Sequence, residues 1–232
     1  MKELFHIHTF RCGHAEQVSD EDYIRKAIDM QAKRIVFTDH APFPNNPFGN
    51  RMTYEELDEY IASLHNLKEK YSKIIEVQIG LEIEYLPSYS EYYQELHNRR
   101  ELDLLMLGQH FYEMRDGTWS FSYKRLPEHD VEGCVRAIIE GIQTGVFSVV
   151  AHPDRSFRIM EHWNTKCDKL SKEIISTARQ YEVLLEQNFS SQLRKNCYRK
   201  EFWNLVPTEN KVIQGIDAHC ISVIEKYVRT NE

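Results

Sequence analysis

Seven short apolar segments of this chain are separated mostly by stretches that have the residue spacing of amphipathic helices. The apolar segments are expected to be strands, and they cover residues 4–8, 34–38, 75–83, 104–108, 146–150, 182–186 and 211–216. The stretches between them carry apolar residues three and four apart, as Leu57, Ile61 and Leu64 do, which is the pattern of a helix that buries one face. Such alternation is typical of a parallel α/β sheet or barrel. At 232 residues, the chain is expected to form a single domain, residues 1–232.

The first apolar segment runs into a turn, and together they contain three histidines. His6 and His8 alternate along the expected strand, and alternate side chains of a strand share one face. Two imidazoles side by side can hold one metal ion, and His14 can return over the site from the following loop. Because an H-x-H pair is also common in solvated histidine clusters, this stretch alone leaves both interpretations open.

Side chains that bind metals recur at or near the carboxyl ends of six of the seven expected strands. They are His6, His8, Asp39, His40, Glu82, His110, His152, Asp217 and His219. Active sites of α/β barrels gather at this end of the strands. So many buried polar groups are costly without partners, and metal ions would satisfy them together, so the pattern predicts a metal site. The other histidines are expected to be ordinary surface residues: His65, His97, His129 and His162.

Charge and hydropathy exclude several classes of partner. The chain has 36 acidic and 29 basic residues, with a formal net charge of −7. A general nucleic-acid binder needs a basic face, so nucleic acid is not an expected partner, although a local basic pocket for one phosphate stays open. No apolar run approaches the roughly 18 residues of a membrane span, so no membrane partner is expected. The sequence does not specify an oligomeric state.

The cysteines and the N-terminus indicate the compartment. Five cysteines, an odd number without C-x-x-C spacing, predict a reduced cytoplasmic protein rather than a disulfide framework or a zinc ribbon. The first residues enter the first expected strand at once, which leaves no room for a signal peptide.

Two connecting segments are expected to be loops. Residues 41–52 contain three prolines and a glycine, which oppose regular structure, and a loop of this length often covers a binding site. Residues 111–126 carry several aromatic residues and are also expected to be a loop. Glu84 follows Glu82 by two residues and is expected to point away from the site or to lie beside it, where its loss should matter less.

The ordered set of motifs resembles the PHP (polymerase and histidinol phosphatase) family over essentially the whole chain. The motifs are His6-Ile7-His8 with His14, Asp39-His40, Gly80-Leu81-Glu82, Gly108-Gln109-His110, Ala151-His152-Pro153 and Asp217-Ala218-His219. Three segments look most like the bacterial histidinol-phosphatase branch: residues 38–42, 51–53 and 80–85. The resemblance implies a distorted seven-stranded (β/α)7 TIM-like barrel, with a metal site at the carboxyl ends of the strands.

The resemblance also implies two to three divalent transition metal ions. By position, His6, His8, Glu82 and Asp217 would bind the first ion. Glu82 would bridge to a second ion, completed by His110 and His152, and the third ion would be held by His14, His40 and His219. Imidazole suits zinc, iron and manganese, and a bridging carboxylate suits a multi-metal site, so the ligands leave the metal open.

The implied reaction is hydrolysis of a small phosphomonoester, most closely histidinol phosphate in histidine biosynthesis. Neighbouring metal ions lower the pKa of a shared water and hold phosphate oxygens, and cationic side chains bind the same oxygens. Arg158 and Arg194 match basic positions that the branch uses for substrate, with Arg155 as a neighbouring alternative and Arg51 as a further substrate-binding residue. Asp39 is either the acid that protonates the leaving alcohol or a partner that orients a histidine. The expected catalytic residues are Asp39, Glu82, Arg158 and Arg194.

Some positions depart from the family pattern and leave other functions open. Gln109 replaces the usual small or β-branched residue, and Gln187-Asn188-Phe189 differs from the usual glutamate–apolar–asparagine run. One alternative is a relative that acts on another small phosphomonoester or a nucleotide, and another is a protein-tyrosine phosphatase of the same superfamily. A non-catalytic metal-binding domain is a third, but the complete ligand set argues against it because decayed domains lose ligands.

Overall fold

The computed structural model describes residues 3–121 and 128–231. Seven strands form one sheet in the order β1-β2-β3-β4-β7-β8-β9, and the β1–β2, β2–β3, β4–β7 and β7–β8 pairs are parallel. The strands are β1 (Glu3–Ile7), β2 (Arg34–His40), β3 (Glu76–Ile83), β4 (Leu104–Leu107), β7 (Val149–Val150), β8 (Leu184–Asn188) and β9 (Val212–Gly215). The predicted alternation of strands and helices is confirmed, and the main sheet of the described residues has the predicted seven strands.

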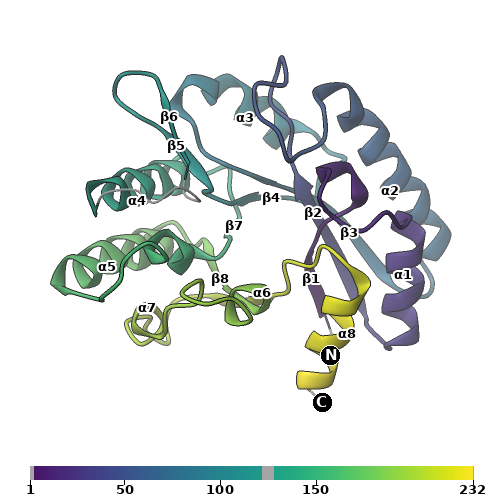
Figure 1. Ribbon diagram of the computed structural model, residues 1–232. Coiled ribbons are helices and arrows are strands. Elements are labelled where there is room, and N and C mark those ends of the chain that lie inside the picture. The colour runs from purple at the N-terminus through teal and green to yellow at the C-terminus, as the bar shows by residue number, and fades with distance from the viewer. Residues whose placement is uncertain (1–2, 122–127, 232) are drawn as a thin grey trace. The chain divides into compact units, whose positions relative to one another are not determined.

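The chain divides into two compact units. The first unit comprises Met1–Glu82, Arg99–Leu105 and Gly215–Glu232, and the second comprises Ile83–Asn98 and Met106–Gln214. The first unit contains α1 (Asp20–Asp29) and α2 (Leu57–Tyr71), which lie side by side in Figure 1, and also α8 (Ile221–Thr230). A capping box between Ser19 and Asp22 fixes the start of α1, because each side chain binds a backbone N–H at the helix end.

The segment after β9 returns to β1 within the first unit. The amide of Ile216 donates to the carbonyl of Phe5 at 2.8 Å, and the amide of Ala218 donates to the carbonyl of His6 at 3.1 Å. The amide of His8 in turn donates to the carbonyl of Ala218 at 2.9 Å. This ladder places Asp217 and His219 beside the two N-terminal histidines, although they are about two hundred residues apart in the sequence.

The end of β1 is irregular. Phe5 pairs with Val36 and Ile7 with Phe37, so His6 is an extra residue in a β-bulge, and its φ is +72°. The chain then forms a short 3₁₀ turn at Phe10–Cys12, which Gly13 ends with φ of +77°, a left-handed conformation that glycine adopts without strain. The bulge and the turn set the directions of the histidines on either side.

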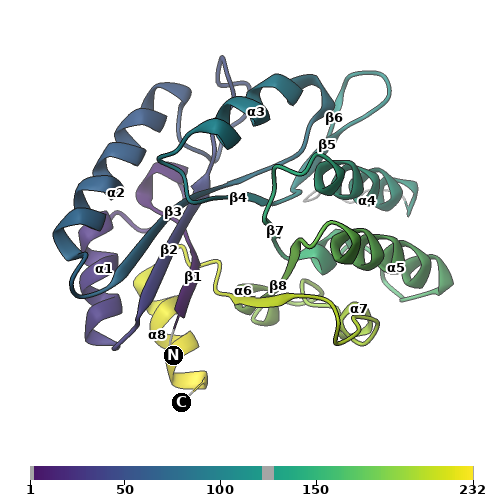
Figure 2. The same ribbon diagram turned by 180° about the vertical axis from the view of Figure 1, so that it is seen from behind.

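The second unit contains helices α3 (Ser90–Asn98), α4 (Glu128–Gln143) and α5 (Thr165–Gln180), and the short α6 (Phe189–Gln192) and α7 (Lys200–Trp203). Helices α4 and α5 pack side by side, as Figure 2 shows. Residues 111–121 are not the expected loop, because they form a hairpin of β5 (Phe111–Glu113) and β6 (Trp119–Phe121). The rest of that prediction, residues 122–126, lies outside the described part of the chain. The expected strand 146–150 is shorter than predicted, since only Val149 and Val150 pair with neighbours.

Residues 41–52 contain neither helix nor strand, as predicted. The loop is braced from within: the Arg51 guanidinium donates to the carbonyl of Ala41 at 2.9 Å and lies over the rings of Phe43 and Phe48. None of the helices in residues 3–121 and 128–231 is long and apolar enough to cross a membrane.

Candidate metal centre

Four predicted metal ligands form a buried cluster in the first unit, here called the inner cluster: His6, His8, Glu82 and Asp217. Nε2 of His6 lies 3.4 Å from Oε2 of Glu82 and 4.0 Å from Oδ1 of Asp217. Nε2 of His8 lies 3.5 Å from the same two oxygens. Two imidazoles and two carboxylates therefore face one small volume, although they come from three distant parts of the chain.

The burial and contacts of His8 indicate whether this cluster fits a metal ion. Its side chain is fully buried, and neither ring nitrogen makes a hydrogen bond to the described residues. Nδ1 lies 3.5 Å from Oδ1 of Asp39. Leaving a buried polar group without a hydrogen bond costs about 1–3 kcal/mol, and a cation among these nitrogen and oxygen atoms would remove that cost. The donor set is the one that divalent transition metals prefer.

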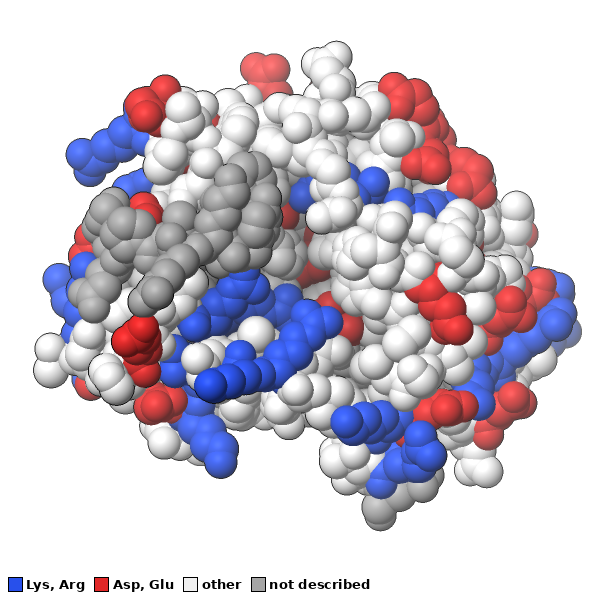
Figure 3. All heavy atoms as spheres, viewed as in Figure 1, with Lys and Arg blue, Asp and Glu red and all other residues white. Residues whose placement is uncertain are grey.

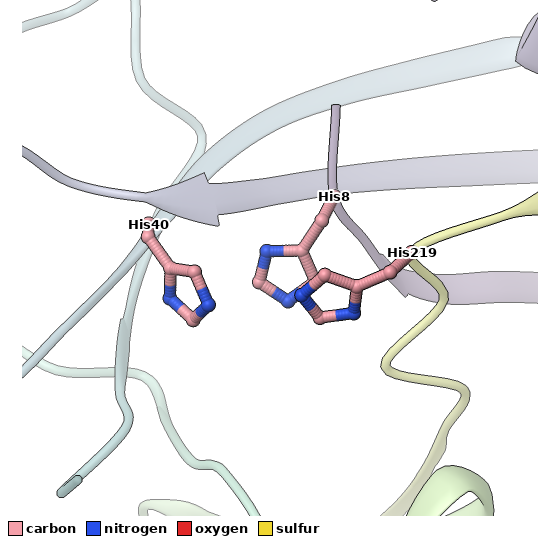
Figure 4. A group of neighbouring side chains, drawn as sticks. All are labelled: His8, His40 and His219. Carbon is pink, nitrogen blue, oxygen red and sulfur yellow. The ribbon is translucent and has the colours of Figure 1, made fainter. Parts of the chain in front are cut away.

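Three more histidines extend the inner cluster. Figure 4 shows His8 at the end of β1, His40 at the end of β2 and His219 on the segment before α8, with their rings gathered together. Potential ligand atoms of these three side chains lie within 4.8 Å of one another. The ring of His14 lies 4.5 Å from that of His219 and 5.4 Å from that of His40, measured between centroids. The predicted third-ion residues are therefore neighbours.

Burial and charge determine the protonation of these rings. Burial, and then repulsion by His8, lowers the pKa of His219 to about 2, so its ring is neutral and keeps a lone pair for a metal. Burial alone would lower the pKa of His8, but the carboxylates of Asp217 and Asp39 raise it overall above its ordinary value. A metal ion must therefore compete with a proton at His8.

Asp39 is fully buried, and both of its carboxylate oxygens are engaged. Oδ2 accepts hydrogen bonds from the backbone N–H and the hydroxyl of Thr9. Oδ1 accepts from the backbone N–H of His40 at 3.0 Å and faces Nδ1 of His8. These contacts favour the second of the two predicted roles, in which Asp39 orients a histidine rather than protonating a leaving group.

Three of the predicted ligands have a left-handed backbone. The φ angles are +72° for His6, +57° for Asp217 and +31° for His152. Non-glycine residues in this region cost of order 1–3 kcal/mol each, and they cluster at sites where the surrounding structure enforces them. The fold thus holds these side chains in directions that a regular strand would not give.

The second unit contains the other two predicted histidine ligands. The rings of His110 and His152 lie 5.1 Å apart between centroids. Nδ1 of His110 lies 2.9 Å from Oε1 of Glu84, which is almost completely buried. Of the two expected placements of Glu84, the structure shows the one beside a predicted ligand and not the one that points away.

A buried carboxylate that the sequence did not single out supports His152. Oε2 of Glu186 accepts the backbone N–H of His152 at 2.9 Å and the side-chain amide of Asn188 at 3.1 Å. Glu186 is fully buried on β8. The bond fixes the left-handed residue His152 to the neighbouring strand. The sequence gave no signal for this role, because it depends on the pairing of β7 with β8.

The predicted phosphate-binding arginines gather in the second unit. Arg155 donates to Oγ of Ser191 at 2.9 Å and to Oδ1 of Asn188 at 3.4 Å. Burial, and then the neighbouring cations Arg155 and Arg194, lowers the pKa of Arg158. Figure 3 shows Lys and Arg side chains gathered over this part of the unit, where Arg194 also lines an open cavity of about 540 Å³. Because these cations repel one another, a bound anion would stabilise them.

Two other predicted positions have contacts of their own. Arg51 braces its loop, as described above, and nothing in the structure tests its expected role with substrate. The departure at Gln109 has a local explanation, because its side-chain amide bonds the backbone N–H and carbonyl of Tyr85 and the carbonyl of Phe111. Gln109 thereby fixes the backbone around His110.

Two known proteins with similar sequences are named as histidinol-phosphatases. A candidate histidinol-phosphatase of Deinococcus radiodurans is 29% identical over 160 residues, which cover 64% of this chain and 59% of that protein. The histidinol-phosphatase of Bacillus subtilis is 29% identical over 92 residues, 37% of this chain and 34% of that protein. These alignments span less than two thirds of the relatives' own length.

Solved structures extend the likeness over nearly the whole chain. A candidate histidinol phosphatase of Listeria monocytogenes superposes with a TM-score of 0.81 at 18% identity and covers 99% of both chains. A histidinol phosphate phosphatase of Lactococcus lactis, solved with zinc, L-histidinol and phosphate, gives a TM-score of 0.72 at 18% identity over 99% of this chain and 93% of that one. At this identity the likeness shows the fold alone, and it confirms the expected α/β fold class.

A family model matches most of the chain. The model describes the PHP domain, and it aligns with residues 5–190, the region that contains eleven of the fourteen predicted site positions. The other three predicted site positions, Arg194, Asp217 and His219, lie beyond the matched region. The chain belongs to the PHP domain family.

Proposed function

We propose that this protein is a metal-dependent phosphomonoester hydrolase and that its substrate is histidinol phosphate. The observation that carries the proposal is the inner cluster, in which buried imidazole and carboxylate groups converge and His8 makes no hydrogen bond to residues 3–121 or 128–231. Arg155, Arg158 and Arg194 of the second unit, whose charges act on one another, would bind the phosphate. Both features occur in a chain of the PHP domain family.

The proposed centre contains two to three divalent transition metal ions. The inner cluster would hold the first ion, and His14, His40 and His219 would hold the third. Glu82 would bridge to a second ion bound by His110 and His152. The position of Glu82 in the sequence supports this assignment, because Glu82 is only two residues from Glu84, and the carboxylate of Glu84 contacts His110. When bound, such ions would lower the pKa of a water and polarise the phosphate oxygens.

The side chains of the protein would then bind and orient the substrate. Arg158 and Arg194 would bind the phosphate, while Arg155 is held in place by Ser191 and Asn188. Arg51 would contribute from the loop 41–52, whose rings at Phe43 and Phe48 suit the imidazole of histidinol. Asp39 and Glu84 would fix the orientations of His8 and His110.

The comparisons support this substrate over other phosphomonoesters. The Lactococcus lactis structure is a complex with zinc, L-histidinol and phosphate. L-Histidinol and phosphate are the two products of the proposed reaction. We propose zinc, iron or manganese as the metal, a small phosphorylated molecule as the partner and the cytoplasm as the compartment. The proposed cytoplasmic location rests on the five free cysteines of the chain.

Two measurements test the proposal. Elemental analysis of the purified protein should find two to three equivalents of transition metal. Histidinol phosphate should be hydrolysed with kcat/KM at least about a hundredfold above p-nitrophenyl phosphate, a gap of roughly 2.7 kcal/mol in transition-state binding. Full activity after chelation to a metal-free state would refute the metal dependence. Equal efficiency toward both compounds would indicate a phosphoesterase with another substrate.

A further inference from the structure

Cys12 lies against the predicted third-ion residues, and no role follows for it from the resemblance. It is fully buried at the end of the 3₁₀ turn Phe10–Cys12, two residues before His14. Its sulfur and one ring nitrogen each from His14 and His219 lie within 4.8 Å of one another. Three side chains with metal-binding atoms therefore share a volume beside the inner cluster.

The rings of His14 and His219 both contact the backbone through Nδ1, which leaves Nε2 as the potential metal ligand of each ring. Nδ1 of His14 lies 3.0 Å from the carbonyl oxygen of Cys12, and Nδ1 of His219 lies 3.4 Å from the carbonyl oxygen of Asp217. Both rings thus use Nδ1 for the backbone. Nε2 of His219 is buried and makes no hydrogen bond to the described residues. The fully buried ring of His8 stacks on that of His219, with 4.1 Å between centroids, and it too makes no hydrogen bond within the part of the chain that the structure describes.

The surroundings of the sulfur act on its thiolate form in opposite directions. Backbone N–H groups of His14 and Ala15 face it and favour the thiolate, whereas burial, followed by Asp39, raises the pKa of Cys12 to about 12. The thiolate is the form that binds a metal, so an ion would have to displace the proton of the thiol. Coordination exchanges the S–H bond for a sulfur–metal bond and releases one proton to solvent.

We propose that Cys12 is a ligand of the third metal ion, together with His14 and His219. His40 would complete a four-coordinate site of one sulfur and three nitrogens. The inference rests on the proposed metal centre and deepens it. A thiolate ligand selects zinc or cobalt over manganese or magnesium, so this position would be filled by a softer ion than an all-histidine and carboxylate site requires.

Cobalt(II) reports a sulfur ligand directly. Metal-free protein, prepared by chelation, is titrated with cobalt(II) while the near-ultraviolet and visible spectra are recorded. We expect a thiolate-to-cobalt charge-transfer band in the wild type and its loss in Cys12→Ser. Cys167→Ser is the matched control, because Cys167 is equally buried but lies on α5 in the second unit. The control should retain the band.

A second measurement does not depend on any variant folding. X-ray absorption at the zinc edge of the wild-type zinc protein should show a sulfur neighbour at about 2.3 Å in addition to nitrogen and oxygen neighbours. Bound cobalt without the charge-transfer band, or a zinc spectrum without sulfur, would overturn the role of Cys12 and leave the metal centre standing. Failure to bind cobalt or zinc at all would overturn the proposed function itself.

Discussion

Oε1 of Glu84 lies 2.9 Å from Nδ1 of His110, and the carboxylate is almost completely buried. A carboxylate in this position keeps the proton of the ring on Nδ1, which leaves Nε2 with the lone pair that a metal needs. It also fixes the rotation of the ring. Glu84 is therefore a positioning residue for His110 in the proposed centre, although it is not itself a predicted ligand.

Removal of Glu84 should weaken metal binding. We expect Glu84→Ala to lower the metal affinity of the His110 site about 10- to 100-fold, the usual loss when such a partner is removed. Glu84→Gln should lose less, because its amide oxygen can still accept from Nδ1. Chelator competition on the metal-loaded protein measures the affinity. Glu140→Ala, on the surface of α4, is the control; equal affinities in all variants would contradict the positioning role.

Glu82 should be essential for both metal and activity. As the proposed bridge it would touch two ions, so we expect Glu82→Ala to lose metal and phosphatase activity while far-ultraviolet circular dichroism still reports a folded chain. Glu76→Ala changes a carboxylate at the exposed start of the same strand and should retain both. A Glu82→Ala protein with normal metal content would show that the bridging carboxylate is elsewhere.

Arg194 should act on the part of the substrate that all phosphomonoesters share. Loss of one charged hydrogen bond is worth about 1.5–3 kcal/mol, so Arg194→Ala should lower kcat/KM roughly 10- to 100-fold for both histidinol phosphate and p-nitrophenyl phosphate. The ratio of the two values should change much less. Lys169→Ala, an exposed cation of α5, serves as the control. A large change in the ratio would place Arg194 near the histidinol end instead.

Metal affinity should rise with pH. The pKa of His8 is raised above its ordinary value in the metal-free protein, so protons compete with the metal at and below neutral pH. We expect the apparent affinity of the inner cluster to increase as pH rises through and beyond the ordinary histidine range and then to level off. Isothermal titration with zinc at several pH values, in buffers of different ionisation enthalpy, measures both affinity and released protons. An affinity that is constant across this range would exclude proton competition at His8.

Asp154 should make stability depend on pH. Burial raises its pKa from 3.8 to about 6, so the folded state disfavours the charged form. Because the folded pKa is the higher one, stability is fully present below pH 3.8 and falls as pH rises to about 6. The loss is about 3 kcal/mol at 1.36 kcal/mol per pKa unit.

The variant Asp154→Asn removes that charge but keeps an acceptor for the backbone N–H of Arg199. Its stability advantage over the wild type in urea denaturation should therefore grow by about 2 kcal/mol between pH 4.5 and pH 7.5. Asp116→Asn, in an exposed turn, should show no such gain. A pH-independent difference between Asp154→Asn and the wild type would contradict the burial effect.

Several features of this protein follow from the sequence because they depend on neighbouring residues. The period of apolar residues distinguishes the strands from the helices, and the capping box at Ser19 fixes the start of α1 without tertiary contacts. The residue types at the strand ends predict which side chains are close to one another in the first unit. The proline-rich segment 41–52 predicts its own lack of regular structure, and the structure agrees.

Other features required the tertiary structure because they depend on partners far away in the chain. Strand alternation does not reveal the bulge at His6 or the pairing of residues 216–218 with β1. Three further contacts join segments that no local sequence pattern connects. Glu186 accepts a hydrogen bond from His152, Asp39 faces His8, and Cys12 approaches His219. Sequence periodicity fixes which face a side chain takes within one element, whereas the orientation of a ligand is decided by the backbone strain and hydrogen bonds that other elements impose on it.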